Sequence, residues 1–307
     1  MSKRLVISIL LALAAGIFAP ILHAQGGPAE TVPDFKDQGK WNNIPPTRAS
    51  YRGKKPSTAP IPKRDLSGIW DSGQVLGTSG ALEHPALYPG GKGQEGGHPD
   101  ETGVEKPLPF TPAGLEALKK NKPSGPSVRQ VDAALTNDPA GKCDPLGFPY
   151  MYLWEFRTID VVQSSRQVVI LSPFYGNYRI IWTDGRALPD DPDPRWNGYS
   201  VGKWTDDYTF VVETLGLNPK SWIDHAGRPH SDQLKTEETY HRIDHDTIEL
   251  TLKITDPIMY TEPWLALNKL PLHLQPPDFD IPELLCSPSE FSDYNNVVAS
   301  PVIRDQK

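Results

Sequence analysis

Hydrophobic and polar positions alternate with a period of two in the second half of the chain, which is the spacing of strands with one buried and one wet face. In 247–254 the Ile and Leu positions share one side, and the Thr, Glu and Lys positions share the other. Residues 208–213 alternate in the same way. The pattern predicts eight strands, at 155–163, 166–172, 177–184, 198–205, 207–214, 235–243, 246–254 and 263–268.

The lengths of the links between these strands favour one architecture. A sheet of this many strands either curls into a barrel or splits into a sandwich. We expect a mainly β fold, an antiparallel up-and-down meander in a lipocalin-like barrel, with a two-sheet sandwich as the competing fold. In such a meander, successive links lie at opposite ends of the sheet. The long links would then share one end and form a mouth there: about 185–197, 215–234 and 255–262.

The first half of the chain has a looser pattern, which predicts one strand and one helix. Leu66, Ile69 and Trp70 give the short strand its apolar positions. For the helix, Thr111 is a typical N-cap, and Pro112 suits the first helical position. The predicted organisation is a signal peptide at 1–24, an irregular arm at 25–63, a loop-rich lead-in at 64–150, the β domain at 151–290 and a tail at 291–307.

The N-terminus carries the pattern of a secretory signal peptide. Lys3 and Arg4 precede an apolar run that ends near Leu22, and Ala24 offers a small residue for cleavage. A retained membrane anchor is the alternative, since the run is nearly long enough to span a bilayer. Pro20 favours cleavage, which predicts a periplasmic or secreted protein with no stable membrane insertion. The Pro-rich stretch that follows is expected to be extended or to wrap the domain.

Charge and cysteine content narrow the possible partners. The net charge of -7, from 38 acidic and 31 basic residues, argues against a nucleic-acid partner. We expect a small-molecule ligand or substrate instead, and the oligomeric state stays open. Cys143 and Cys286 are the only two cysteines, which predicts one disulfide in an oxidising compartment, with two free buried thiols as the alternative.

Three strings carry a resemblance to known proteins: TDGRALPDDPDPRWNGYSVGKW, WIDHAGRPHS and TDPIMYTEPW. Over about 135–290 this series resembles a family of secreted bacterial proteins of uncharacterised function. The string DLSGIW and the meander resemble lipocalin-like (calycin) barrels more weakly. That second resemblance implies a barrel that holds a small apolar ligand, or, in a minority of such proteins, an isomerase, hydratase or cyclase. Neither resemblance implies a catalytic residue.

The densest group of chemically active residues is the stretch 224–232, which contains two His and two Asp. An imidazole oriented by a carboxylate is a usual general acid or base. His230 is therefore the candidate acid/base, Asp224 its orienting carboxylate, and His225 a ligand contact. The alternative is a surface turn, because Asp, Gly, Pro and Ser are turn formers.

A second group lies between Asp184 and Trp196. The planar fork of Arg186 can clamp a ligand carboxylate or a neighbouring Asp. The carboxylates of Asp190, Asp191 and Asp193 could attract Ca²⁺, but they lack the ligand spacing of an EF-hand. We therefore expect no metal.

The strand at 235–243 is polar on both faces, with Glu237 and His241 on one side and Glu238 and Arg242 on the other. Buried charges are costly unless paired or functional. Either the barrel interior is partly polar, as in a ligand cavity, or this is an edge strand that carries charges to prevent aggregation.

Aromatic residues are frequent in the long links. Trp196, Trp222 and Tyr260 lie one in each of the three long links, and Trp264 follows the last of them. Each alone is typical of packing. Together they could form a platform for a flat ligand such as a sugar, phenol or terpenoid.

These patterns favour a binding protein that holds a small aromatic or apolar molecule at the mouth. The alternative is a cofactor-independent isomerase, lyase or hydrolase that uses His230 and Asp224, and a structural envelope protein is a third interpretation. No phosphate loop, dinucleotide fingerprint or zinc-protease helix is present, so we expect no cofactor. The predicted ligand contacts are Arg186, Trp196, Trp222, His225, Glu237, His241, Tyr260 and Trp264.

Overall fold

The computed structural model of the chain describes residues 55–72, 97–99, 105–124, 131–132, 135–153, 156–281, 283–294 and 297. The expected signal peptide, most of the expected arm and most of the tail lie outside these ranges. None of the described helices is long and apolar enough to cross a lipid bilayer.

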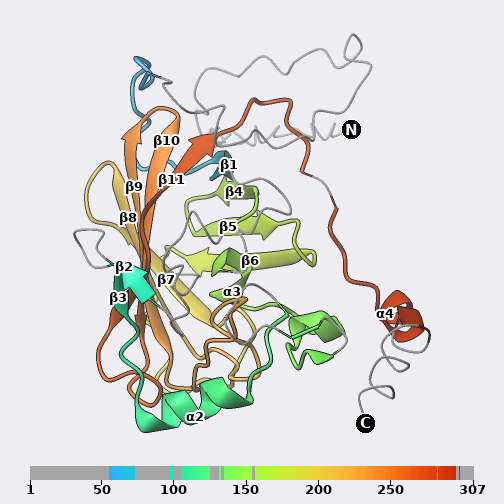
Figure 1. Ribbon diagram of the computed structural model, residues 1–307. Coiled ribbons are helices and arrows are strands. Elements are labelled where there is room, and N and C mark those ends of the chain that lie inside the picture. The colour runs from blue at the N-terminus through green and yellow to red at the C-terminus, as the bar shows by residue number, and fades with distance from the viewer. Residues whose placement is uncertain are drawn as a thin grey trace, which may run out of the picture. The chain divides into compact units, whose positions relative to one another are not determined.

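Nine strands close into one barrel, in the order β1-β11-β10-β9-β8-β7-β6-β5-β4 (Figure 1). The strands are β1 (Gly68–Asp71), β4 (Ile159–Gln163), β5 (Gln167–Ser172), β6 (Asn177–Trp182), β7 (Tyr199–Trp204), β8 (Thr209–Leu215), β9 (Lys235–Asp244), β10 (Thr247–Thr255) and β11 (Trp264–Leu274). Each of the eight strands predicted from periodicity is present, with shifted ends. The prediction of a mainly β barrel is confirmed.

The lead-in strand belongs to the barrel, although it precedes the expected β domain in sequence. β1 pairs with β11 at Trp70↔Leu274 and with β4 at Gly68↔Val161, and so closes the sheet. The lead-in also holds a two-stranded sheet and more helices than the single one expected. These elements are β2 (Gly97–Pro99), β3 (Glu105–Pro107), α2 (Pro112–Lys120), the 3-10 helix η4 (Ala140–Lys142) and α3 (Tyr150–Leu153), with α4 (Pro288–Tyr294) near the C-terminus.

The expected helix is α2, and its cap forms as predicted. The Thr111 hydroxyl accepts a hydrogen bond from the Gly114 N–H, 2.9 Å away. α3 escapes a search for periodicity because four residues make little more than one helical turn.

The expectation of a strictly antiparallel meander is wrong at one pair of strands. A closed sheet with an odd number of strands cannot be antiparallel throughout, and here β6 and β7 run parallel. They pair only at Ile181↔Ser200 and Trp182↔Val201. The link 183–198 must therefore return along the length of the barrel from one end to the other.

Because β6 and β7 run parallel, the links are distributed over the two ends of the barrel differently from the expectation. We call the end with links 164–166, 205–208 and 245–246 the plain end, and the end with links 173–176, 216–234 and 256–263 the loop end. The predicted grouping of the last two long links is confirmed. The third long link begins at the plain end and only finishes at the loop end, so the expected three-loop mouth is wrong in that part. α2 caps the loop end, where Thr111 N–H donates to the Met259 carbonyl (Figure 1).

The barrel interior is filled by side chains. Its described core includes Ile181, Phe210 and Leu250, each with no exposed surface. The cavity left between the strands has a volume of about 10 Å³, about the minimum for a single water molecule. A barrel of this strand number is just wide enough for side chains to fill it. A ligand held inside the barrel, as in lipocalins, does not fit this packing.

The interior is nevertheless partly polar, through a buried ion pair. Arg179 of β6 donates to both carboxylate oxygens of Glu238 on β9, and the Arg179 Nη1–Glu238 Oε1 distance is 2.9 Å. The Tyr240 hydroxyl donates to Glu238 Oε1 at 2.7 Å, and the Arg179 guanidinium lies 3.7 Å from the centre of the Phe148 ring. β9 pairs with both β8 and β10, so the edge-strand alternative is wrong.

Candidate functional site

A cleft of about 590 Å³ lies on the outer side of the barrel, where β6 and β7 separate. Outward-facing side chains of β6 contribute one side, and the end of the link before β7 contributes another. Residues near the disulfide complete it. We call it the seam cleft; its lining residues are Cys143, Pro145, Leu146, Tyr175 to Ile180, Trp182, Arg195 to Tyr199, Leu285 and Cys286.

The seam cleft exists because the two strands pair over so short a length. Beyond Ile181 and Trp182, the Asn197 side-chain amide bridges the strands. It donates to the Tyr178 carbonyl at 2.8 Å and to Asn177 Oδ1 at 2.7 Å. Gly198 follows with φ 61°, and a Cβ there would lie 2.6 Å from the Leu215 carbonyl oxygen. Asn197 and Gly198 therefore set the separation of the strands at the cleft.

Aromatic rings dominate the lining. The rings are Tyr175, Tyr178, Trp182, Trp196 and Tyr199. Tyr178 is 60% exposed, although strand residues with large apolar faces are usually covered. An exposed group of rings next to a cleft is typical of a ligand site or an interaction surface.

Arg186 holds one of these rings in place. Its guanidinium lies 3.6 Å from the centre of the Trp182 ring. The same guanidinium donates to both oxygens of Asp184, from Nε at 2.9 Å and from Nη2 at 2.6 Å. The hydrogen bond from Arg186 holds the pKa of the Asp184 carboxyl at about 2, below its ordinary value. Of the two predicted roles, clamping a neighbouring Asp is therefore the one observed.

The charged side chains in the lining are two arginines. Arg179 is matched by Glu238 inside the barrel. Arg195 lies over the Tyr199 ring, 4.1 Å from its centre, and forms no ion pair with a carboxylate in the described ranges. Among the residues that the structure describes, the lining contains no Asp, Glu or Lys. The cleft is therefore locally positive in a chain with a net negative charge.

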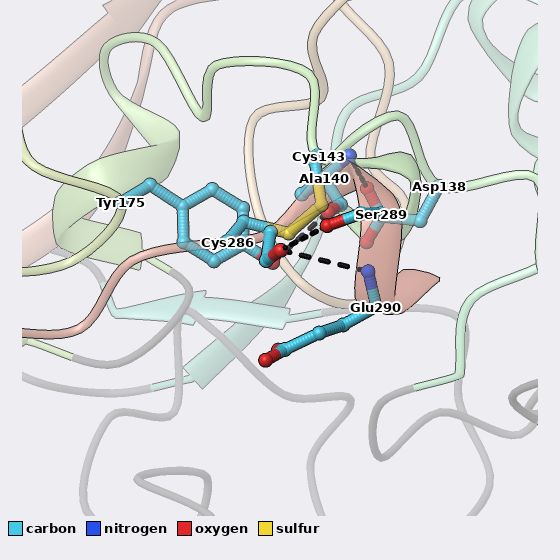
Figure 2. The surroundings of a disulfide bond; sticks show 8 residues. Asp138, Ala140, Cys143, Tyr175, Cys286, Ser289 and Glu290 are labelled. Carbon is cyan, nitrogen blue, oxygen red and sulfur yellow. Dashed lines mark hydrogen bonds between the residues drawn. A yellow bond between two sulfur atoms is a disulfide. The ribbon is translucent and has the colours of Figure 1, made fainter. Parts of the chain in front are cut away.

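The disulfide between Cys143 and Cys286 confirms the cysteine prediction and forms part of the cleft wall. Figure 2 shows the Tyr175 ring alongside it, with the Tyr175 hydroxyl donating to the Ala140 carbonyl at 2.9 Å. The Tyr175 N–H donates to the Leu284 carbonyl at 2.7 Å. The disulfide thus ties the segment after β11 to the rim of the cleft.

No family model, curated protein or solved structure matches this chain. The resemblance to a secreted bacterial family stays a prediction. The function of the seam cleft must be argued from its own side chains.

The predicted catalytic pair lies in a buried part of the loop end. The Asp224 carboxylate accepts from Arg228 Nη1 at 2.7 Å and from the Ala226 N–H at 3.0 Å. His230 instead places Nδ1 2.9 Å from the Ser231 carbonyl and Nε2 3.0 Å from Ser221 Oγ. The expected orienting hydrogen bond between Asp224 and His230 does not form.

Burial lowers the pKa of His230, because the charged imidazolium loses its hydration there. The Nδ1 contact with a carbonyl oxygen makes Nδ1 the protonated nitrogen of a neutral ring. Since the side chain is 3% exposed, substrate access to it is blocked in this conformation. A catalytic role for His230 stays a prediction.

The two long links of the loop end are joined by a further hydrogen-bond network. Asp256 accepts from the Ser231 N–H at 2.6 Å and from the Ser231 hydroxyl at 2.8 Å. The Tyr260 hydroxyl donates to the Pro229 carbonyl at 2.9 Å. Polar groups that satisfy one another in this way stabilise a buried loop. The turn chemistry weighed for 224–232 is therefore present, in a buried rather than a surface position.

The predicted aromatic platform is divided between two places. Trp222, Tyr260 and Trp264 are buried in the core of the loop end, where the Tyr260 and Trp264 rings pack at 5.3 Å. Trp196 alone of the predicted rings lines the seam cleft. A ligand role for the three buried rings stays a prediction.

The remaining predicted contacts are spread over the molecule. His225 is partly buried, and burial lowers its pKa to about 4, with the nearby Arg157 charge adding to the effect. Glu237 pairs with Lys253 at 2.8 Å, and exposed His241 lies 2.9 Å from Thr209 Oγ1. The opposite face of β9, with Glu238, is the one that points into the barrel.

Sequence reasoning missed most of the seam cleft, although β6 carries a usable signal. Its outward positions Tyr178, Ile180 and Trp182 are apolar or aromatic, while its inward position Arg179 is charged. A strand with a charge inside and large apolar groups outside departs from the usual pattern. This reversed pattern indicates that the outer face of β6 is not an ordinary solvent-exposed surface, and in the structure it lines the cleft.

A second cleft, of about 660 Å³, is acidic. Asp190, Asp191, Asp193 and Asp232 line it together with Lys235. Within the described ranges, no group of three or more His, Cys, Asp or Glu side chains has the arrangement to hold a metal ion. This cleft therefore carries no functional assignment.

Proposed function

We propose that the protein binds a small molecule with a planar aromatic or apolar face in the seam cleft. The observation that carries this proposal is the set of rings around the cleft, above all Tyr178, Trp182 and Trp196. The volume of about 590 Å³ lies in the range of small-molecule sites. Rings of this kind offer large contact areas at low entropic cost.

The rings are held in position before any ligand arrives, which supports the proposal. Arg186 covers Trp182, and the Tyr199 hydroxyl donates to the Asp193 carbonyl at 3.1 Å. Asn197 spans the open seam. Preorganised contacts raise affinity because fewer side chains must be ordered on binding.

A periplasmic or secreted location is part of the proposal. Disulfides persist in oxidising compartments, and the bond between Cys143 and Cys286 is formed. The N-terminal sequence pattern supports the same location. The competing enzymatic function at His230 is less well supported, because the side chain is 3% exposed and out of reach of a substrate in this conformation.

The proposal can be tested by thermal-shift screening with planar aromatic, sugar and terpenoid ligands, followed by calorimetric titration of the compounds that stabilise the protein. Tyr178→Ala should weaken binding by about fivefold, because a single ring contact contributes roughly 1 kcal/mol. Tyr294→Ala removes an exposed tyrosine on α4, outside the cleft, and should leave the affinity unchanged. Equal effects of both substitutions, or binding by none of the ligands, would overturn the proposal.

A further inference from the structure

We infer that the ligand of the seam cleft is a planar aromatic carboxylate, and that Arg195 binds its carboxylate group. This inference rests on the proposed function and adds the chemical class of the ligand. It is drawn from the charges and hydrogen-bond donors that line the cleft.

Arg195 offers an unmatched positive charge at the rim. Its side chain is exposed, and the guanidinium lies 4.1 Å from the centre of the Tyr199 ring. Stacking occupies one face of the guanidinium and leaves its N–H groups, which lie in the plane, able to donate. In the described parts of the chain no carboxylate lies within ion-pair distance of it.

The absence of acidic groups from the lining is unusual for this chain. The sequence has 38 acidic residues against 31 basic ones, yet none of the acidic residues in the described ranges lines the seam cleft. Asp190, Asp191 and Asp193 precede Arg195 closely in sequence but line the second cleft instead. An anionic ligand would thus meet a positive group and no lining carboxylate to repel it.

The two indoles add donors to the lining, although the hydroxyls of Tyr175, Tyr178 and Tyr199 can also accept. The indole N–H groups of Trp182 and Trp196 can only donate, and neither has an acceptor among the described residues. Asn177 and Asn197 already hydrogen-bond to each other. The ligand must therefore supply acceptors, and a carboxylate supplies two oxygens that accept bidentate hydrogen bonds from Arg.

Other ligand chemistries match the lining less well. A neutral sugar can hydrogen-bond to the lining, but it has no charge to pair with the Arg195 guanidinium. A phosphate monoester carries close to two negative charges at neutral pH, while Arg195 supplies one unmatched positive charge. A single carboxylate on a planar ring matches both the charge and the aromatic surroundings.

Calorimetric titrations of the full chain with benzoate and cinnamate, with their primary amides and with phenyl phosphate, test the inference. Each acid should bind at least about tenfold more tightly than its amide, since a charge-assisted bidentate contact is worth more than about 1.4 kcal/mol. Arg195→Met keeps an apolar group over Tyr199 and should remove the preference for the acid. Lys203→Met causes the same loss of charge outside the cleft lining and should keep the preference.

Three results separate the inference from the function on which it rests. Equal binding of acids and amides by the unmodified protein overturns the carboxylate inference and leaves the seam cleft a neutral aromatic site. Tighter binding of phenyl phosphate than of benzoate also overturns it. Loss of amide binding in Arg195→Met, to the same extent as acid binding, shows a packing role for Arg195 and overturns the inference. Binding by none of these compounds overturns the inference, and the proposed function is overturned as well only when the thermal-shift screen also finds no ligand.

Discussion

The buried Arg179–Glu238 pair is the most consequential residue-scale feature of the barrel. Removing two charges from water costs several kcal/mol per ion, and their attraction offsets this only when geometry and further hydrogen bonds are favourable. Here Ser200 and Thr214 accept from Arg179, and Tyr240 donates to Glu238. The network therefore supplies hydrogen-bond partners to both ions, and the loss of either ion should strongly destabilise the fold.

We expect Glu238→Gln to lower the free energy of unfolding by about 3 kcal/mol, because it leaves the Arg179 charge buried without a counter-ion. The double variant Arg179→Met, Glu238→Gln should be less destabilised than the sum of the two single substitutions Arg179→Met and Glu238→Gln. Urea unfolding of the four proteins measures this coupling. Strictly additive effects would show that the two side chains do not stabilise each other.

Asp138 makes stability depend on pH at the residue scale. Its carboxylate accepts from the Ala140 N–H and from the Tyr150 hydroxyl, and it has no exposed surface. Burial raises the pKa of this carboxyl from 3.8 to about 6, although the hydrogen bond from Tyr150 opposes the increase. The folded protein therefore holds this proton more tightly than the unfolded chain.

Because the folded pKa is raised, the contribution of Asp138 to stability is full below pH 3.8 and is lost as pH rises through about 6. At about 1.4 kcal/mol per pH unit, this loss amounts to roughly 3 kcal/mol. His225, whose pKa is lowered to about 4, acts in the opposite direction, since its contribution is gained as pH rises towards 6.5. Its effect cancels when two proteins that both contain it are compared.

We therefore expect the stability of Asp138→Asn, relative to the unmodified protein, to increase by roughly 3 kcal/mol between pH 4 and pH 7. Urea unfolding at several pH values gives this difference directly. A constant difference across the range would mean that Asp138 titrates normally in the folded state.

At the scale of elements, the disulfide joins two segments that the barrel alone does not connect. Cys143 follows η4, and Cys286 lies between β11 and α4, at a sequence separation of 143. Apart from the disulfide, the Phe174↔Leu284 bridge holds the second segment near the cleft. Since Leu285 and Cys286 line the cleft, the disulfide supports the proposed ligand site directly.

Replacing both cysteines by serine should lower the free energy of unfolding by about 2–4 kcal/mol, because the unfolded chain gains freedom. The ligand affinity of the cleft should fall as well, while the far-ultraviolet circular dichroism of the barrel stays the same. Calorimetry and denaturant unfolding test the two parts separately. Unchanged affinity in the double variant would show that the disulfide wall does not contribute to the site.

The β6–β7 seam and the β1–β11 junction have the fewest paired positions of the barrel. The seam has two paired positions, whereas β9 and β10 pair along their whole length from Asp244 to Lys235. Amides without a ladder partner exchange quickly with solvent.

We expect fast hydrogen exchange at the β6 amides that face β7, and slow exchange in β10. A ligand of the cleft should slow the exchange at the seam. Uniform protection around the barrel would contradict the seam as described.

At the scale of the whole molecule, the strands could be predicted but the way they close could not. Period-two alternation is a local signal, and it identified strands such as β8 and β10 almost in full. Closure depends on contacts between residues distant in sequence, such as β1 with β11. Nothing local in residues 183–198 indicates that this link returns along the barrel and makes β7 parallel to β6.

The same difference between local signals and long-range contacts explains which parts of the site were predictable. The clamp of Arg186 on Asp184 involves residues two apart, and it was one of the two predicted roles. Trp196 was predicted from its own link. Tyr178 and Trp182 were missed as site residues because the cleft beside them results from the strand separation, which is not a local property. The His and Asp of 224–232 attracted a functional interpretation, and the structure shows a buried, hydrogen-bonded loop.

The central claim is that ligands bind at the seam cleft rather than among the long links 216–234 and 256–263, and tryptophan residues mark both places. Trp182 and Trp196 line the cleft, while Trp222 and Trp264 are buried at the loop end. Fluorine NMR of protein labelled with fluorotryptophan, with signals assigned from Trp→Phe variants, reports on each site during titration with cinnamate. The account predicts that the Trp182 and Trp196 signals shift and that the Trp222 and Trp264 signals do not. Shifts confined to Trp222 and Trp264 would contradict it and place the ligand among the loops.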